Sequence, residues 1–387
     1  MKEKLTRRTE VQTSAKANRL VSLDALRGFN MFWIIGADQI AGALKDLNFP
    51  GAGMLTSQLQ HADWNGFTFY DLIYPMFIFV VGVAISLSLK RRLEKGQSRW
   101  LIGRHIVTRT VILFLLGVYL SNSGLDLHGW LTNIRLMGVL QRIALSYCAA
   151  SLLVLFTKDR TQILIAGIIL SGYYLLLRFA PVPGYGAGVW NPPEANFANY
   201  FDSLFLPGRL YYKTWDVEGL LSTLPAIVTC LLGVFTGYWL RGEWRFRGKP
   251  VDQWQKALIL AVAGGILTGL GFIWGLDFPV IKKIWTSSYT LLTGGLGMIS
   301  LALFYWLIDI KGFKKWAFPF IVIGLNSIFI YLAVNIIPFG AISKWLTGED
   351  LLAWLGRGGV LGLTMLSFFL EWVVLYFMYR RKIFIKL

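Results

Sequence analysis

Long apolar stretches, separated by shorter polar segments, recur along the whole chain. A helix needs about 20 residues to cross the roughly 30 Å of hydrocarbon in a bilayer, so each stretch predicts a transmembrane helix. About ten stretches fit this length. They cover residues 21–44, 67–89, 106–120, 134–156, 163–179, 220–240, 257–276, 289–308, 317–337 and 360–379. The pattern therefore predicts an all-α, polytopic membrane helix bundle.

Composition supports this fold class, and charge adds an orientation. The 387 residues are 55% hydrophobic and 15% charged, whereas soluble domains are roughly 25% charged. The net charge is +17, and the basic residues gather in alternate connecting segments. Such segments face the cytoplasm in membrane proteins, and both chain termini are expected to lie on that side. The basic residues thus indicate membrane topology and not nucleic-acid binding.

One membrane domain, residues 19–387, is expected after a polar, basic leader at residues 1–18, which we interpret as cytoplasmic. Residues 180–217 form a long extracytoplasmic segment rich in Pro, Gly, Asn and aromatic residues. Long loops are usually functional or disordered, and the aromatic content argues against disorder. The segment is interpreted either as a lid that binds a sugar or as an ordered loop without a ligand.

Polar side chains cluster just before the second apolar stretch, on the side predicted to be extracytoplasmic. His61 is one of three histidines, and imidazole titrates near neutral pH, which suits a general base. Asp71 could orient that imidazole. The alternative is an ordinary helix start, with Asn65 as a cap, Asp71 near the helix N-terminus and Trp64 as an interfacial anchor.

Several ionisable groups lie inside apolar stretches, where they are costly and usually functional. Asp38 lies late in the first stretch, and Arg142, beside Gln141, lies well inside the fourth. A buried guanidinium needs a carboxylate, a phosphate or a polar cavity, so Arg142 predicts a polar passage through the bundle. Arg27 either pairs with Asp24 or holds an anionic ligand.

Other polar residues are open to two interpretations. Arg104 and Arg109 lie near the predicted cytoplasmic boundary, where an arginine can extend along apolar surface to water. Asn326 and Ser327 lie within the ninth stretch and fit interhelical contacts as well as they fit ligand contacts. The sequence contains no metal-ligand spacing and no phosphate-binding glycine loop, so no metal is expected.

Seven segments in consistent order carry a more specific signal: RLVSLDALRGF, HADWNGFTFYDLIYPMFIFVVGVAI, GVLQRIALSY, WDVEGLLSTLPAI, KKIWTSSYTLLTGGL, GLNSIFIYL and YRRKIFIKL. Together they resemble the heparan-α-glucosaminide N-acetyltransferase family of transmembrane acetyltransferases. The resemblance implies transfer of acetyl from cytosolic acetyl-CoA to the amine of a glucosamine-type sugar across the lipid bilayer. It also implies a bacterial inner-membrane enzyme, and a homodimer.

The resemblance assigns roles residue by residue. His61 matches the catalytic histidine, Asn65 and Asp71 are its motif companions, and Asp38 stands where the lysosomal member has an asparagine. Acetyl-CoA is then expected at a set of inner and mid-bundle residues: Arg27, Arg104, Arg109, Arg142, Asn326 and Ser327. The acceptor sugar is expected at three residues of the opposite side: Trp64, Asp216 and Glu218.

The reaction itself stays open on three points. His61 acts either as general base in a ternary complex or as a nucleophile that forms acetyl-histidine. A hydroxyl acceptor in place of an amine gives a polysaccharide O-acetyltransferase. A transporter of sugars or anions, with Asp38 and Arg142 as coupling groups, is the alternative of another class.

Overall fold

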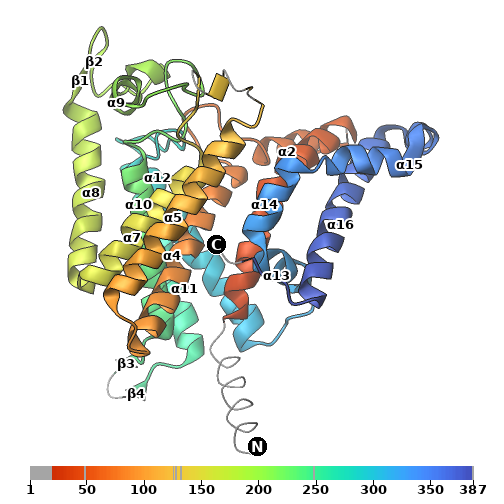
Figure 1. Ribbon diagram of the computed structural model, residues 1–387. Coiled ribbons are helices and arrows are strands. Elements are labelled where there is room, and N and C mark those ends of the chain that lie inside the picture. The colour runs from red at the N-terminus through yellow and green to blue at the C-terminus, as the bar shows by residue number, and fades with distance from the viewer. Residues whose placement is uncertain are drawn as a thin grey trace, which may run out of the picture.

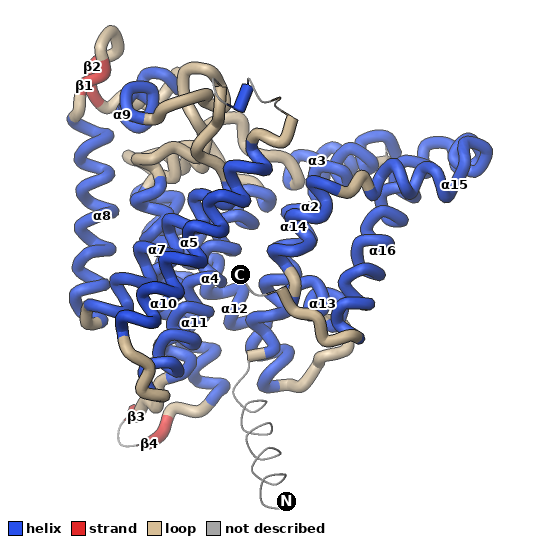
Figure 2. The backbone as a smooth tube through the Cα atoms, in the orientation of Figure 1, coloured by secondary structure: helices blue, strands red, loops and turns tan. Residues whose placement is uncertain are grey.

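The computed structural model describes residues 20–47, 49–124, 126, 129–130, 133–246 and 249–385, so the expected leader at residues 1–18 lies outside the described residues. Helices dominate the described chain (Figure 2). Its strands form two short antiparallel hairpins, in which β1 (Pro181–Val182) pairs with β2 (Gly186–Ala187) and β3 (Arg245–Phe246) pairs with β4 (Lys249–Pro250).

The helices follow one another along the chain, with the longer connections before α7, around α9 and before α12. The α-helices are α2 (Val21–Leu47), α3 (Ala52–Gln58), α4 (Phe69–Glu94), α5 (Arg99–Ser121), α7 (Val139–Phe156), α8 (Asp159–Phe179), α9 (Phe197–Phe205), α10 (Thr223–Arg241), α11 (Gln253–Trp274), α12 (Ser287–Phe304), α13 (Phe318–Leu325), α14 (Ser327–Ile336), α15 (Phe339–Leu355) and α16 (Gly359–Arg380). A π-helical segment, η2 (Tyr305–Ile310), continues α12, and short 3-10 turns are η1 (Pro193–Ala195) and η3 (Gly356–Gly358).

Eight of the described helices are long and apolar enough to cross a membrane: α4, α5, α7, α8, α10, α11, α12 with η2, and α16. The count becomes nine if α13 and α14 form one broken span. The expected ten spans are therefore not all supported. The first, α2, is helical over 27 residues, but Asp24, Arg27 and Asp38 reduce its apolar character below that of the others.

The ninth expected span is broken in the middle. Helices α13 and α14 meet at an angle of 78°, and Asn326 lies at the break with φ −129° and ψ 37°. Its Nδ2 donates to the carbonyl of Ile383 (3.0 Å), and its Oδ1 accepts from the amide of Ile385 (2.9 Å). The segment 383–385 therefore satisfies the polar group that the break exposes inside the bundle.

The bundle has two distinct ends (Figure 1). Helices α3, α9 and α15 and the β1–β2 hairpin lie at one end, which we call the His61 end, and the β3–β4 hairpin lies at the other, the β3–β4 end. Segments predicted to be extracytoplasmic therefore gather at the His61 end. Helix α15 lies where a connection was expected; it is interrupted at Gly348, whose φ of +72° is left-handed.

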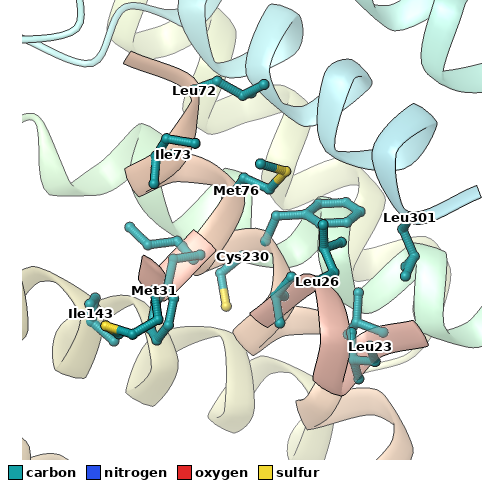
Figure 3. Packing of buried hydrophobic residues seen from close by; sticks show 14 of the residues in the cluster. Leu23, Leu26, Met31, Leu72, Ile73, Met76, Ile143, Cys230 and Leu301 are labelled. Carbon is teal, nitrogen blue, oxygen red and sulfur yellow. The ribbon is translucent and has the colours of Figure 1, made fainter. Parts of the chain in front are cut away.

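The core lies where α2, α4, α7, α10 and α12 converge (Figure 3). Leu26, Ile73, Ile143, Cys230 and Leu301, one from each of these helices, are all at most 7% exposed. Burying a Leu or Ile side chain stabilises a fold by about 1.5–3 kcal/mol. This shared core fixes α4, whose first turn carries the chemistry described below.

Small residues bring α4 and α10 into close contact. A Cβ at Gly82 would lie 1.9 Å from the carbonyl oxygen of Cys230, and one at Gly233 would lie 1.9 Å from that of Phe79. Only glycine fits at both positions, and such pairs let helix backbones approach closely within a membrane. The contact fixes the position of α4 relative to its neighbour.

Candidate active site

Asp71 joins the turn before α4 to the first turn of the helix. Its Oδ1 lies 2.9 Å from Nδ1 of His61, and its Oδ2 accepts from the amide of Ala62 (3.2 Å) and from the amide (3.2 Å) and hydroxyl (3.1 Å) of Thr68. The Asp71 carboxylate therefore bonds to the amides at the start of the helix and to the imidazole at the same time. With its proton on Nδ1, His61 presents Nε2 as a hydrogen-bond acceptor.

Two further side chains enclose the His61 imidazole. The Tyr70 ring stacks on it, with centroids 4.4 Å apart and planes 4° apart. Lys282, from the connection between α11 and α12, places Nζ 2.7 Å from Nδ1 and 3.0 Å from Nε2. Burial lowers the pKa of Lys282, and the nearby carboxylate of Asp71 opposes this effect.

Aromatic residues of the segment 180–217 pack against the His61 turn. The indole N–H of Trp64 donates to the carbonyl of Trp190 (2.8 Å), and the Trp64 ring meets that of Trp215 edge to face at 5.5 Å. Asn65 is exposed in the same turn. Trp64 therefore ties the turn to the long segment, and Asn65 faces solvent beside it.

Asp216 and Glu218 share one arginine at the His61 end. Arg135 donates from Nε and a terminal nitrogen to Asp216 (2.9 and 2.6 Å) and from that terminal nitrogen to Glu218 (2.8 Å). Burial alone would lower the pKa of Arg135, but the two carboxylates raise it above its ordinary value. Asp216 also accepts from the amides of Tyr211 and Glu218 (3.0 Å each), so it is fully engaged inside the protein.

Arg142 is buried, 1% exposed, but its partners are not carboxylates. It donates to the carbonyl of Val217 (3.1 Å) and to the hydroxyl of Ser222 (2.5 Å), and it lies over the Trp285 ring at 4.9 Å. Neutral acceptors and an aromatic face thus surround a charge that was expected to line a polar passage, while its buried Nε has no hydrogen-bond partner among the described residues. Arg142 supports the chain entering α10 and lies outside the lining of the cavity described next.

A cavity of about 590 Å³ lies among α2, α4, α5, α7, α13 and α14. Basic side chains line the part of the cavity toward its β3–β4 end, together with Asp24: Arg27 and Arg92 lie near the ends of α2 and α4, and His105 and Arg109 lie farther inside α5. Apolar residues line its middle, and Val139 and Tyr331 lie farther toward the His61 end. A cationic mouth followed by an apolar passage suits a ligand with an anionic head and a less polar arm.

Predicted donor residues divide into two groups. Arg27, Arg109 and Ser327 line this cavity, whereas Arg104 is exposed and outside its lining. Asn326 does not line it but holds the segment 383–385, whose side chains at 384 and 385 do. The sequence pattern alone does not separate Arg104 from Arg109, because which helix face meets the cavity depends on packing.

Tyrosines lie between the cavity and the imidazole, and His61 itself is not part of the cavity lining. The Tyr74 hydroxyl donates to the carbonyl of Val139 (3.1 Å), which lines the cavity. Tyr331 lies within electrostatic range of Tyr70 and Tyr74. Asp38 is exposed and interacts with the Tyr70 hydroxyl, so it belongs to the neighbourhood of His61.

Sequence reasoning assigned no role to Lys282 or Arg135. Lys282 and Lys283 form a basic pair in a segment predicted to be extracytoplasmic. Lys and Arg are depleted in such segments, so this unexpected pair could have pointed to a functional lysine. Arg135 had no comparable signal, because its partners lie 81 and 83 residues away in the sequence.

Comparison with known proteins places this geometry in a family. The family model described as heparan-alpha-glucosaminide N-acetyltransferase, catalytic, matches residues 19–266. The chain is 28% identical to heparan-alpha-glucosaminide N-acetyltransferase of Homo sapiens over 97% of this chain and 61% of the relative. It is 25% identical to the Mus musculus protein of that name over 87% of this chain and 56% of the relative.

The chain thus spans about three fifths of the length of these curated relatives. The matched region contains the His61 turn, helix α4 and the arginines of the cavity mouth. With a family model that covers well over half of its length, this multi-pass membrane chain belongs to the heparan-α-glucosaminide N-acetyltransferase catalytic family.

Proposed function

We propose that the protein transfers the acetyl group of acetyl-CoA, bound from the β3–β4 end, to the amine of a glucosamine-type sugar at the His61 end. The observation that carries this proposal is a cavity with basic residues at one end and with Val139 and Tyr331 nearer the end where His61 and Asp71 pair outside its lining. The names of the relatives support the choice of reaction and acceptor.

Donor binding follows from the charge pattern of the cavity. The phosphates of coenzyme A carry several negative charges, and guanidinium groups bind phosphate through paired hydrogen bonds. We assign this role to Arg27 and Arg109, with Arg92 beside them. The less polar pantetheine arm occupies the apolar middle and carries the thioester toward Tyr331 and His61.

His61 acts as the general base in this proposal. Asp71 fixes the imidazole with the proton on Nδ1, so Nε2 removes a proton from the acceptor amine as that amine attacks the acetyl carbon. The Asp71 carboxylate then stabilises the imidazolium that forms. Such a base contributes about 10²- to 10⁴-fold to the rate.

The acceptor end is assigned to the surface where Trp64 and Glu218 lie. Asp216 is fully occupied by Arg135 and backbone amides, so we assign it a supporting role there. In this proposal the basic end of the cavity lies at the cytoplasmic face of a bacterial inner membrane. A homodimer is part of the same proposal and follows from the family resemblance.

Transfer across sealed vesicles tests the proposal. Labelled acetyl-CoA is supplied on the side of the β3–β4 end and glucosamine on the other, with wild type compared with His61→Ala. We expect acetylated glucosamine with wild type and a loss of at least 10²-fold with the variant. Thermal stabilisation by coenzyme A should persist in His61→Ala, which shows that the donor still binds.

The alternative functions give different results in the same vesicles. Glucosamine that crosses unmodified, equally in wild type and His61→Ala, contradicts the enzyme and supports a transporter. Acetylation only of hydroxyl acceptors supports the O-acetyltransferase. A burst of acetyl-enzyme formed without acceptor supports the acetyl-histidine route.

A pair of arginines on one helix tests donor binding. Arg109 lines the cavity and Arg104, one and a half turns earlier on α5, does not. Arg109→Ala should raise KM for acetyl-CoA roughly 10-fold, since a hydrogen bond to a charged group contributes about 1.5–3 kcal/mol. Arg104→Ala is the matched control, and equal effects of the two substitutions would contradict the assigned donor site.

A further inference from the structure

Lys282 occupies the position that a reacting group would need beside His61. Its Nζ lies 2.7 Å from Nδ1 and 3.0 Å from Nε2 of the imidazole, and 3.4 Å from Oδ1 of Asp71. The lysine side chain is only 13% exposed, while that of His61 is 46% exposed. The ammonium therefore approaches the imidazole from the protein side, and the open side remains for the acceptor.

The contacts of the neighbouring lysine differ completely. Lys283 donates to the carbonyl of Asp63 (2.6 Å) and lies over the rings of Tyr212 and Trp215. Lys283 thus stabilises the turn that contains Asp63, whereas Lys282 contacts the imidazole of His61 and the carboxylate of Asp71. This division singles out Lys282 from the general positive charge of the segment.

We propose that Lys282 is a second catalytic group, which lies against the imidazole of His61 in the resting enzyme and donates to the carbonyl oxygen of the acetyl donor during transfer. The inference rests on the proposed acetyl transfer and deepens it. A donor within 3.0 Å of the base nitrogen is close to both the attacking amine and the carbonyl under attack. A preorganised donor at that oxygen stabilises the charge that develops there.

The step balances in atoms and charge. The acceptor nitrogen bonds to the acetyl carbon, the carbonyl π electrons move to oxygen, and Lys282 hydrogen-bonds that oxygen while Nε2 takes the amine proton. The carbonyl then re-forms, the carbon–sulfur bond breaks, and the coenzyme A thiolate receives the proton from the imidazolium. The oxyanion and imidazolium charges cancel, as do those of Asp71 and Lys282.

Several charged or titratable groups face Lys282 and His61. Asp71 and Tyr70 come from α4, Asp38 from α2 and Glu218 from the segment before α10. Burial lowers the pKa of the lysine, and the carboxylates around it favour the ammonium. A lysine in this setting gives a proton or a hydrogen bond more readily than one in water does.

The first experiment measures the chemical reactivity of the His61 imidazole and does not depend on enzyme turnover. Carbethoxylation of His61 by diethyl pyrocarbonate is followed by peptide mass spectrometry at one fixed pH in wild type, Lys282→Met, Lys282→Arg and Lys283→Met. Because the Lys282 side chain covers both ring nitrogens, Lys282→Met should make His61 react faster. Lys282→Arg and Lys283→Met should keep the wild-type rate of modification.

Turnover supplies the second measurement. Lys282→Met should lower kcat for acetyl transfer about 10²-fold, with an unchanged thermal shift by coenzyme A as proof of folding and donor binding. An unchanged carbethoxylation rate or a wild-type kcat in that variant overturns the inference. If wild type transfers no acetyl group, the proposed function fails, and the role of Lys282 at the carbonyl oxygen fails with it. A faster carbethoxylation of His61 in Lys282→Met would still support the contact between Lys282 and His61.

Discussion

The imidazole of His61 lies flat on the ring of Tyr70, with centroids 4.4 Å apart and planes 4° apart. Asp71 fixes one ring atom of the histidine, and the tyrosine fixes the plane in which the ring lies. Together they define the direction of the Nε2 lone pair. The orientation of a catalytic base affects its rate directly, because proton transfer requires near-linear geometry.

Removal of the stack should therefore slow transfer without weakening donor binding. Tyr70→Leu is expected to lower kcat roughly 2- to 10-fold, since an aromatic pair contributes about 0.5–1.5 kcal/mol beyond its buried area. Tyr70→Phe keeps the ring and serves as the control. Steady-state kinetics separates the two effects, and an equal loss in both variants would instead assign the effect to the hydroxyl beside Asp38.

Arg135 should be essential for stability at the His61 end. Arg135→Met leaves Asp216 and Glu218 without their counterion, and the Asp216 side chain is fully buried. Breaking such a buried pair costs about 3–5 kcal/mol. Arg209→Met removes an exposed side chain whose one hydrogen bond among the described residues is to a carbonyl at 3.5 Å, and it should cost less than about 0.5 kcal/mol. Thermal unfolding in detergent measures both, and similar Tm values would contradict this assignment.

Asp202 should make the segment 180–217 less stable as pH rises. Burial raises the pKa of this α9 carboxyl from 3.8 to about 6, despite bonds from the amides of Leu220 and Leu221. The folded state then binds the proton more tightly than the unfolded state. Stability contributed by the protonated form is present below about pH 4 and is lost as pH rises to about 6, a change on the order of 3 kcal/mol.

Limited proteolysis of that segment between pH 4 and pH 8 measures the effect. Asp202→Asn is the matched variant, because its amide oxygen still accepts from both backbone amides but does not ionise. Cleavage should accelerate with pH more steeply in wild type than in the variant, after correction for the pH dependence of the protease. Parallel slopes would show that Asp202 does not cause the change.

Asn326 should link donor binding to the segment 383–385. Asn326→Ala removes two hydrogen bonds to that segment, which costs about 1–3 kcal/mol, and it should raise KM for acetyl-CoA because residues 384 and 385 line the cavity. Asn335→Ala is the control, since Asn335 is exposed on α14 and donates to a carbonyl of its own helix. A normal KM in Asn326→Ala would separate the segment from the donor site.

The apolar pattern predicted the long helices because each one needs only its own composition to be recognised. The association of His61 with Asp71 was also predictable, since the two residues lie ten apart and flank the first turn of one helix. Asp71 contacts both the backbone amides of the helix start and the imidazole, because its two oxygens have different partners.

Long-range contacts were not predictable in the same way. Lys282 meets His61 across 221 residues, and Arg142 finds its partners 75 to 80 residues away. Neither pairing has a local pattern, because it depends on how α4, α7 and α12 pack. The break between α13 and α14 was missed for a related reason: the apolar run continues through Asn326, and the group that satisfies the break comes from near Ile383.

That break also bears on how the chain is made. Asn326 enters the membrane during synthesis 57 residues ahead of Ile383, so its amide side chain has no native partner while α14, α15 and α16 are being inserted. A cavity wall that includes residues 384 and 385 is completed only after α16 has been translated. Assembly of the proposed donor site is therefore completed only after insertion of α16, and ribosome-bound chains stalled before residue 383 should bind coenzyme A more weakly than the finished chain.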